Sequence, residues 1–374
     1  MKKKSVSSVL NMIKGLSEEQ KNMLSEQILK MLSSSQNTRN HMCNDLIGSD
    51  IEKPDCPHCG AKAKLGYIVK NGQNRGAQRY LYKSCGKKFV PTTNTVFART
   101  RKDADTWRKY VKLTISGKSL HECAEECDIG YQTAFTWRHK ILNAFVANQN
   151  KTKMNGIIEV DEMLIPLSYK GNHVPGEFGG RTRVHGTTNG LPRPAFKRGT
   201  DNKSMSSKDK ACVFCMVGNN NSSYFAAVPG VGFMNEQMLD ATVGAHVVKE
   251  DSMMLADEYK ITKKYFESNG YTHEILSSNT SDNPHDHKPE VKDGLHIQHV
   301  NAMHHHIRNF LRPYCGVSSK YLGNYVAMFV WLKNIAKSTR KKEIDKVSLT
   351  RAFTPDCYIT RKEIDMKPAI PVCA

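Results

Sequence analysis

The chain has 374 residues, and its 55 Lys and Arg against 36 Asp and Glu give a net charge of +19. So large a basic excess predicts a polyanionic partner, because Lys and Arg that neutralise phosphates release condensed counterions. The 39% of apolar residues allows sizeable cores and argues against a disordered chain. The longest apolar run, residues 325–332, is too short to cross a membrane, so we expect no membrane partner.

The first 50 residues predict a helical lead-in followed by a linker. Ser17 and the acidic residues after it are typical of a helix start, and a stretch rich in Ser and Asn follows at 33–40. Nothing in this segment fits a secretion signal. The 11 cysteines therefore indicate reduced thiols or metal ligands rather than a disulfide framework.

Residues 53–97 predict a compact basic module built around cysteines. Within residues 53–102, 12 Lys or Arg accompany a single Asp. A charge run is usually a solvated face, but cysteines at metal-ligand spacing in the same segment favour contact with nucleic acid. The candidate zinc ligands are Cys56, Cys59 and Cys85.

This zinc-ribbon-like module lacks one ligand of the usual four. Tyr82 stands where the second cysteine pair needs its first member, and tetrahedral structural zinc takes four Cys or His ligands. His58, inside the first pair, and Cys43, upstream of it, are the alternatives for the fourth ligand. A module without metal is the other interpretation.

Residues 100–147 predict three helices, of which the last two form a helix-turn-helix. Ser119 and Glu122 make a capping box, and Gly130 allows a tight turn before the third helix. An ordinary helical hairpin is the alternative, and the basic neighbour favours DNA binding. The candidate DNA contacts in this region and the preceding module are Lys87, Lys88, Arg101, Gln132, Thr133, Arg138 and Lys140.

Residues 155–340 predict an α+β domain. The expected strands are 156–160, 211–217, 223–228, 253–256 and 273–276, and the expected helices are 236–248, 261–267, 300–311 and 320–337. Three strands, a helix and a fourth strand, followed by alternating helix and strand, is the order of a ribonuclease H-like nuclease core with a mixed sheet. Residues 341–374 predict a loose C-terminal tail.

Two acidic residues are the candidate catalytic carboxylates of this domain. Asp161 and Asp257 each follow an apolar strand, where side chains emerge at a sheet edge and can converge. A lone Asp at such a position is more often a turn residue, but the order of the elements places both at the metal site of a ribonuclease H-like core. Carboxylate oxygens suit Mg²⁺ or Mn²⁺, and two such ions can activate the attacking oxygen and stabilise the leaving oxygen of a phosphodiester.

The third ligand is expected on the helix 300–311. Asn301 and His304 are three residues apart and share a face, and Arg308 lies one turn further on, where it can contact phosphate. Histidine-rich tracts can also be solvated or bind adventitious metal. Seven of the 15 histidines lie between His285 and His306, so Asn301 and His304 remain rival ligands.

The insertion after the first strand is basic. Residues 168–210 hold nine Lys or Arg against three acidic residues. Cationic side chains there suit phosphate contacts near the cleavage site, and a solvated loop is the alternative. The candidates named for DNA contact are Lys170, Arg181, Arg183, Arg193 and Arg198.

Several spaced motifs together resemble one family of proteins. These motifs are similar to those of zinc-ribbon-headed DDE-type insertion-sequence transposases. They are the stretch 301–311 with 316–325, the acidic motifs at 159–162 and 256–259, and the segments 119–124 and 131–141. These transposases are the bacterial relatives of eukaryotic Merlin elements, and the similarity runs from about residue 50 to residue 340 in the family's order. Tyr82 and the 44-residue spacing from Asp257 to Asn301 depart from the family pattern.

The resemblance implies a transposase that binds the ends of an insertion sequence and catalyses metal-dependent strand cleavage and transfer. Asp161 and Asp257 would be the catalytic carboxylates. The cofactors would be two Mg²⁺ or Mn²⁺ ions at the catalytic centre and a Zn²⁺ ion in the ribbon. The partner would be double-stranded DNA. The protein would act as a homo-oligomer on paired element ends, and it would be located in the cytoplasm, associated with the nucleoid. A DNA-binding regulator, an inactive transposase remnant and a plain nuclease are the alternatives.

Overall fold

The computed structural model describes residues 54–63, 66–74, 77–168, 170, 183–184, 187–188, 210–277, 290–338, 344–352 and 357–368. The chain forms two compact units, residues 1–109 and 110–374. The helical lead-in expected before residue 51 lies outside the described residues. Within them, no helix is both long enough and apolar enough to cross a membrane.

The first unit contains a small antiparallel sheet. Its strands are β1 (Ile68–Asn74), β2 (Ala77–Tyr82) and β3 (Lys88–Phe89), paired in that order. Each strand sends apolar side chains to one small core, where burial of aromatic surface stabilises a module too short to build a larger one. The buried members of this core are Cys56, Ile68, Tyr80, Tyr82 and Phe89.

The helix α4 (Ala104–Ile115) leads from the first unit into the second. It begins where the Asp103 carboxylate accepts a hydrogen bond from the Thr106 amide at 2.7 Å, which satisfies one of the free amides at a helix start. The helices α5 (Leu120–Glu126) and α6 (Tyr131–Gln149) follow. The capping box expected at Ser119 and Glu122 is present at the start of α5.

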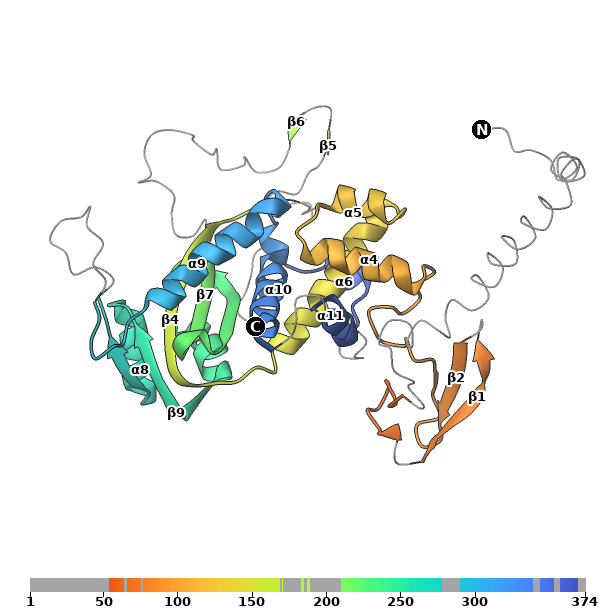
Figure 1. Ribbon diagram of the computed structural model, residues 1–374, viewed down its shortest axis with the longest axis horizontal. Coiled ribbons are helices and arrows are strands. Elements are labelled where there is room, and N and C mark those ends of the chain that lie inside the picture. Colours follow the sequence, from red (N-terminus) through yellow and green to blue (C-terminus); the bar gives the residue numbers. More distant parts are fainter. Residues whose placement is uncertain are drawn as a thin grey trace, which may run out of the picture. The chain divides into compact units, whose positions relative to one another are not determined.

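The second unit is built on a mixed five-stranded sheet (Figure 1). Its strand order is β10 (Thr272–Ile275), β9 (Val247–Ala256), β4 (Met154–Pro166), β7 (Lys210–Gly218) and β8 (Tyr224–Val231). The strands β4, β7 and β8 pair antiparallel, whereas β9 runs parallel to both β4 and β10. The sheet is therefore mixed, as expected for the α+β class.

Apolar residues cover both faces of this sheet. One face packs against α7 (Glu236–Leu239), a π-helical turn (Asp240–Gly244) and α8 (Lys260–Asn269), through Met238, Leu239 and Phe266. The other face packs against α9 (Gln298–Leu311) and α10 (Ser319–Ser338). Because successive residues of a strand point to opposite faces, odd-numbered residues of β4 such as Met163 face α9.

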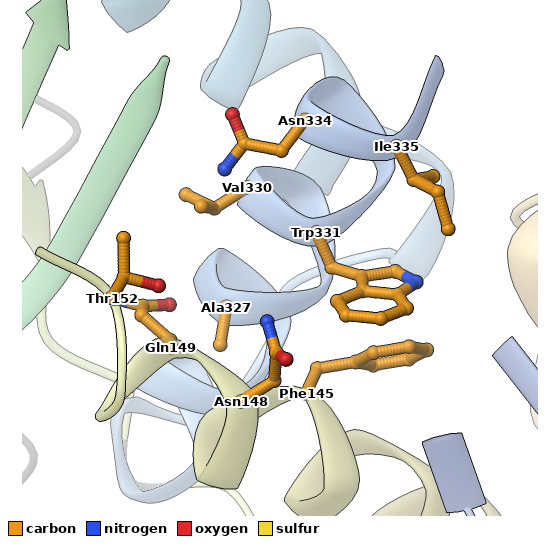
Figure 2. A pocket seen from close by; sticks show the side chains of 9 residues that line it. All are labelled: Phe145, Asn148, Gln149, Thr152, Ala327, Val330, Trp331, Asn334 and Ile335. Atoms are coloured by element: carbon orange, nitrogen blue, oxygen red, sulfur yellow. The ribbon is translucent and has the colours of Figure 1, made fainter. Parts of the chain in front are cut away.

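The helix α6 joins this domain through α10 and β8. A cavity of about 230 Å³ lies between α6 and α10. Figure 2 shows the side chains that line it, with the rings of Phe145 and Trp331 next to each other. The centroids of these two rings are 5.6 Å apart. The Gln149 amide donates to the Ala226 carbonyl of β8 at 2.5 Å, and the Asn334 amide of α10 donates to the Tyr224 carbonyl at 2.9 Å. These bonds hold both helices against the edge of the sheet.

Three expectations about the elements are wrong. The strand before Asp161 does not end there, because pairing with β7 continues to Pro166. The expected helix 236–248 ends early, since residues from Val247 onward pair with the start of β4 instead. The expected loose tail contains α11 (Ile344–Ala352) and α12 (Arg361–Asp365), and Ile364 of α12 is 1% exposed.

The remaining described elements are short. The strands β5 (Arg183–Val184) and β6 (Thr187–Thr188) form a two-stranded ribbon within the basic insertion. Two 3₁₀ turns, Asn219–Asn221 and Arg312–Tyr314, follow β7 and α9. The Cys315 carbonyl after the second turn accepts a hydrogen bond from the Lys170 ammonium at 3.0 Å, which ties the start of the insertion to the end of α9.

Candidate active site

Two neighbouring strands bring Asp161 and Asp257 together. The register of β4 with β9 pairs Glu159 with Leu255, so two further residues along each strand place Asp161 beside Asp257. Asp161 lies within β4 opposite Cys215 of β7, and Asp257 follows the last residue of β9. Asp161, like Met163, is an odd-numbered residue of β4, and these residues face α9. The charge of Asp257 acts on Asp161, so the two carboxylates lie close together.

Burial and repulsion from neighbouring carboxylates disfavour ionisation of Asp161. Burial and then the nearby charges of Asp257 and Glu162 raise the pKa of Asp161 from its usual 3.8 to about 8. The Asp161 side chain is only 16% exposed, and its Oδ1 accepts a hydrogen bond from the Glu162 amide at 2.8 Å. Without a cation nearby, Asp161 is thus largely protonated at neutral pH.

Glu162 is a third acidic residue of this region that the sequence did not single out. Burial and then the charge of Asp257 raise its pKa from 4.5 to about 7. Because the sequence predicts that the strand ends before Asp161, Glu162 is not expected on it; in the structure β4 continues through Glu162, and strand alternation points its side chain away from the α9 face. Its position next to Asp161 was the available signal.

His304 is the residue of α9 that approaches the carboxylates. Its Nδ1 lies 3.7 Å from Asp161 Oδ2, and its Nε2 is buried with no hydrogen-bond partner among the described residues. Burial and then the positive charge of Arg308 lower the pKa of His304 to about 4, so the imidazole is neutral. Asn301 and Arg308, on the same helix, are exposed.

The donor set around Asp161 fits a divalent cation. Two carboxylates that lie close together repel each other when both are ionised, and burial makes ionisation of one of them unfavourable. A bound cation stabilises the ionised forms because it balances their negative charge. The neutral imidazole of His304, whose Nδ1 lies 3.7 Å from Asp161 Oδ2, adds a nitrogen donor that Mn²⁺ accepts readily. The residues that could hold such an ion are Asp161, Asp257 and His304, with Glu162 next to Asp161. Among the described residues their ligand atoms do not all lie within 4.8 Å of one another, so these side chains would have to close around the ion.

The three cysteines of the first unit also converge. One sulfur from each of Cys56, Cys59 and Cys85 lies within 4.8 Å of the other two, and the Cys56 and Cys85 sulfurs are 3.8 Å apart. Of the described residues, no fourth Cys, His, Asp or Glu joins this group, and Cys43 lies outside the described residues. Three thiolates can hold a zinc ion that takes a further ligand from elsewhere.

Tyr82 and His58 pack as aromatic side chains. The Tyr82 ring lies edge-to-face with Tyr67, and Tyr82 is only 9% exposed. The backbone turn survives the loss of the cysteine, because the Gly86 amide still donates to the Tyr82 carbonyl at 2.9 Å. The His58 ring packs against Phe89 at 6.4 Å between centroids. Neither side chain completes the sulfur cluster.

Most candidate DNA contacts in the two N-terminal modules are accessible. The exposed ones are Lys87, Lys88, Arg101, Gln132 and Thr133. Lys140 is half-buried and lies over the Tyr358 ring at 5.8 Å. The prediction for Arg138 is wrong, because its side chain points into the protein: Arg138 is 1% exposed and donates to the Lys118 carbonyl at 2.7 Å.

In the basic insertion, the structure describes only part of the expected surface. Lys170 is exposed, and its ammonium hydrogen-bonds the Cys315 and Gly316 carbonyls. Arg183 belongs to β5. Arg181, Arg193 and Arg198 lie outside the described residues.

Parts of the chain are similar in sequence to proteins of transposable elements. Residues 178–334 match the family described as ISXO2-like transposase domain, a range that contains Asp257 and His304 and begins after Asp161. The chain is also 22% identical over 304 residues, 78% of its length and 89% of the relative's, to a Halobacterium salinarum protein described as an uncharacterized protein in transposable element ISH50. The comparisons therefore support an insertion-sequence transposase, in that residues 178–334, less than half of the chain, are similar to an ISXO2-like transposase domain.

Proposed function

We propose that this chain is a DNA transposase that cuts and joins strands at the centre formed by Asp161, Asp257 and His304. The observation that carries the proposal is the approach of His304 from α9 to Asp161, which itself lies beside Asp257. Three elements far apart in the sequence supply these groups. The match to a transposase family supplies the reaction class.

The proposed core is ribonuclease H-like. Its support is the strand order β8-β7-β4-β9-β10, in which an antiparallel meander is extended on its other side by two parallel strands. In this arrangement the central strand β4 and its parallel neighbour β9 contribute the two aspartates. The helix α9 crosses the same face and contributes the third group.

The chain's own residues have limited chemical roles in such a centre. Asp161 and Asp257 would hold divalent cations, and the neutral imidazole of His304 would complete the ligand set. Bound divalent cations supply charge stabilisation for attack at phosphorus and for the leaving oxygen. Arg308, exposed one turn beyond His304, is suited to bind a DNA phosphate and so to orient the strand.

The basic N-terminal modules would recognise the ends of the element. The support is their charge together with the exposed Lys87, Lys88, Gln132 and Thr133. Zinc held by Cys56, Cys59 and Cys85 would stabilise the first of these modules. Because two element ends react together, we expect a homo-oligomer on DNA, formed in the nucleoid.

Substitution of the aspartates tests the proposal. The assay measures, in Mn²⁺, how much of a labelled duplex that carries the DNA ends flanking this gene is joined to a supercoiled plasmid. Asp161→Asn or Asp257→Asn should abolish this joining, while the variant protein should still bind the duplex. The exposed Asp251→Asn on β9 is the matched control and should keep both activities. Joining by an aspartate variant would overturn the assignment. If the wild type binds the duplex without any cleavage, the result would favour a regulator or an inactive remnant. If it cleaves the duplex but does not join it to the plasmid, the result would favour a nuclease.

The choice between Asn301 and His304 has its own test. We propose His304 as the main ligand, because it is buried beside Asp161 whereas Asn301 is exposed. His304→Ala should lower strand cleavage far more than Asn301→Ala. Because imidazole is a softer donor than carboxylate, His304→Glu should shift the preferred ion from Mn²⁺ towards Mg²⁺. Equal losses in the two alanine variants would contradict this ranking.

A further inference from the structure

A second group of side chains that could bind a metal ion includes Glu159, which lies two residues before Asp161 on β4. Glu159 on the strand, His296 before α9 and His299 in its first turn each place one ligand atom within 4.8 Å of the other two. The three residues come from segments 137 positions apart, so the grouping is a product of the fold. The proposed strand-transfer chemistry does not use it.

Glu159 is held so that one oxygen faces both histidines. Its side chain is 4% exposed, and its Oε2 accepts a hydrogen bond from the Val300 amide at 3.0 Å. The other oxygen, Oε1, lies 2.5 Å from His299 Nδ1 and 3.7 Å from His296 Nδ1. A carboxylate with one oxygen fixed by a backbone amide is oriented in advance for a ligand at the other.

The contact between His296 and Glu159 is hard to explain by hydrogen bonding alone. The Gln298 amide donates to His296 Nδ1 at 3.3 Å, so that nitrogen bears a lone pair and not a proton. Two lone-pair atoms, His296 Nδ1 and Glu159 Oε1, then face each other across 3.7 Å beside a buried carboxylate. Ligand atoms of a tetrahedral zinc ion lie about 3.4 Å apart, given metal–ligand bonds of about 2.1 Å. The separation of His296 from Glu159 is close to this distance, whereas the 2.5 Å hydrogen bond between His299 and Glu159 must open by about 0.9 Å and lose its proton when an ion binds.

An ion can reach this group from solvent. The His296 and His299 side chains are each 26% exposed, and a cavity of about 240 Å³, lined in part by Ala302 and His306, lies beside His299. Two imidazoles and one carboxylate suit a transition-metal ion better than Mg²⁺, which prefers oxygen ligands and retains water. The negative charge of Glu159 offsets the positive end of the α9 dipole.

We infer that Glu159, His296 and His299 form a binding site for a divalent transition-metal ion of the Zn²⁺ class, separate from the Asp161 and Asp257 centre. The ion would join β4 to the start of α9, the helix that carries His304. Its role is then to fix that helix relative to the sheet. The inference does not depend on the strand-transfer activity, since the same ligands would bind metal in an inactive chain.

Metal content measures the site directly. The full-length chain is prepared with Cys56→Ser, Cys59→Ser, Asp161→Asn and Asp257→Asn, which removes the ligands of the other two candidate sites, and is dialysed against Zn²⁺. We expect about one zinc per chain, lost when His296→Asn and His299→Asn are added. The control pair His305→Asn and His306→Asn, exposed histidines of the same helix, should retain it. Equal zinc content with and without His296 and His299 would overturn the inference, as would an equal loss in the control.

Two measurements on the unsubstituted chain guard against misfolded variants. Co²⁺ should produce a visible absorption band from nitrogen and oxygen ligands in addition to any thiolate band. Zn²⁺ should slow hydrogen exchange of the amides of His299 and Val300, at the start of α9, relative to the chelator-treated chain. Thiolate absorption alone, with exchange at α9 unchanged by zinc, would mean that the group is only a hydrogen-bonded carboxylate–imidazole cluster.

Discussion

At the scale of single residues, the chemistry of the proposed centre follows from carboxylates that resist ionisation. The pKa of Asp161 is raised to about 8, and that of Glu162 to about 7, by burial first and then by the negative charge of Asp257. The protonated forms are neutral and bind cations poorly. Protons and metal ions therefore compete for these oxygens across the neutral range.

The affinity for Mn²⁺ should rise with pH. Below its pKa, Asp161 must lose its proton before it binds the ion, and the charge of a bound cation also favours the ionised form of the adjacent Glu162. The affinity therefore falls as pH falls from about 8 to 6, by up to about tenfold per pH unit for each proton released. Above pH 8 both groups are ionised and the dependence flattens. Calorimetric titration of the metal-free chain with Mn²⁺ at several pH values measures the slope of log affinity against pH.

Asp161→Asn tests the origin of that pH dependence. The variant lacks the carboxyl group with the highest pKa and should bind Mn²⁺ more weakly with a shallower pH dependence. Asp251→Asn, at an exposed position of the neighbouring strand β9, is the control and should keep the wild-type slope. A slope that is the same in all three proteins would show that the Asp161 carboxyl does not exchange its proton for metal.

Arg138 illustrates how a residue suited to DNA can serve the core instead. Its guanidinium is buried between helices, donates to the Lys118 carbonyl and to Cys123 Sγ, and lies 5.6 Å from the centre of the Tyr314 ring. The fork of donors that binds phosphate also satisfies a buried carbonyl. The arginine thus stabilises the packing of α6 against its neighbours.

Arg138→Met should destabilise the fold without changing how the protein reads DNA. Loss of the donor leaves the Lys118 carbonyl unsatisfied, at a cost of about 1–3 kcal/mol. Urea unfolding measures this cost, and the exposed Thr133→Ala, in the first turn of α6, should unfold within about 0.5 kcal/mol of wild type. An Arg138→Met variant as stable as wild type but weakened in DNA binding would restore the original DNA-contact interpretation.

At the scale of elements, the C-terminal segment belongs to the second unit. Cys357 and Ile364 are almost fully buried, the Asn143 amide of α6 donates to the Cys357 carbonyl at 3.2 Å, and the Tyr321 hydroxyl of α10 donates to the Ile364 carbonyl at 3.3 Å. The Arg361 guanidinium lies 4.6 Å from the centre of the Phe135 ring. This segment therefore fastens α6 to α10.

Truncation of one side chain in α12 should loosen that joint. Ile364→Ala removes apolar contacts at a buried position and should lower the free energy of unfolding by about 2–4 kcal/mol. Met366→Ala, two residues on and 70% exposed, should leave it nearly unchanged. Chemical denaturation of the full chain compares the two. Similar effects in both variants would mean that the segment contributes little to the folded state.

The sequence predicted the elements whose signals are local. The capping box at Ser119 and the helix carrying His304 depend on residues three or four apart, and both appear as expected. The end of β4, the early end of the helix after Glu236 and the buried C-terminal helix depend on pairing or packing with distant segments. Sequence spacing carries little information about such partners.

The candidate site was predictable in outline for the same reason. Strand-end aspartates and a helix with polar residues three apart indicated Asp161, Asp257 and the region of Asn301 and His304. Which of the last two approaches Asp161 depends on how α9 is rotated about its axis against the sheet. The grouping of Glu159 with His296 and His299 depends on the same rotation, and no spacing within the sequence reveals it.

At the scale of the whole molecule, positive charge is concentrated ahead of the proposed catalytic domain. Residues 53–102 carry 12 Lys or Arg and one Asp, whereas the complete chain has a net charge of +19. Lys87 and Lys88 are exposed beside the cysteine cluster, at the start of β3. A surface of this kind binds DNA mainly through phosphates, and the free energy of binding then depends on the release of counterions.

Lys87→Ala with Lys88→Ala should therefore weaken DNA binding and also make it less sensitive to salt. Each lost phosphate contact lowers the slope of log affinity against log salt concentration by about 0.9, so the double variant should lose about 1.8. Lys263→Ala with Lys264→Ala, an exposed pair on α8, removes the same net charge and should retain the wild-type slope. Fluorescence anisotropy with a labelled duplex from 50 to about 200 mM salt measures all three proteins. Slopes reduced equally in both double variants would show that net charge alone governs binding, whereas a loss confined to Lys87 and Lys88 would assign phosphate contact to the first unit.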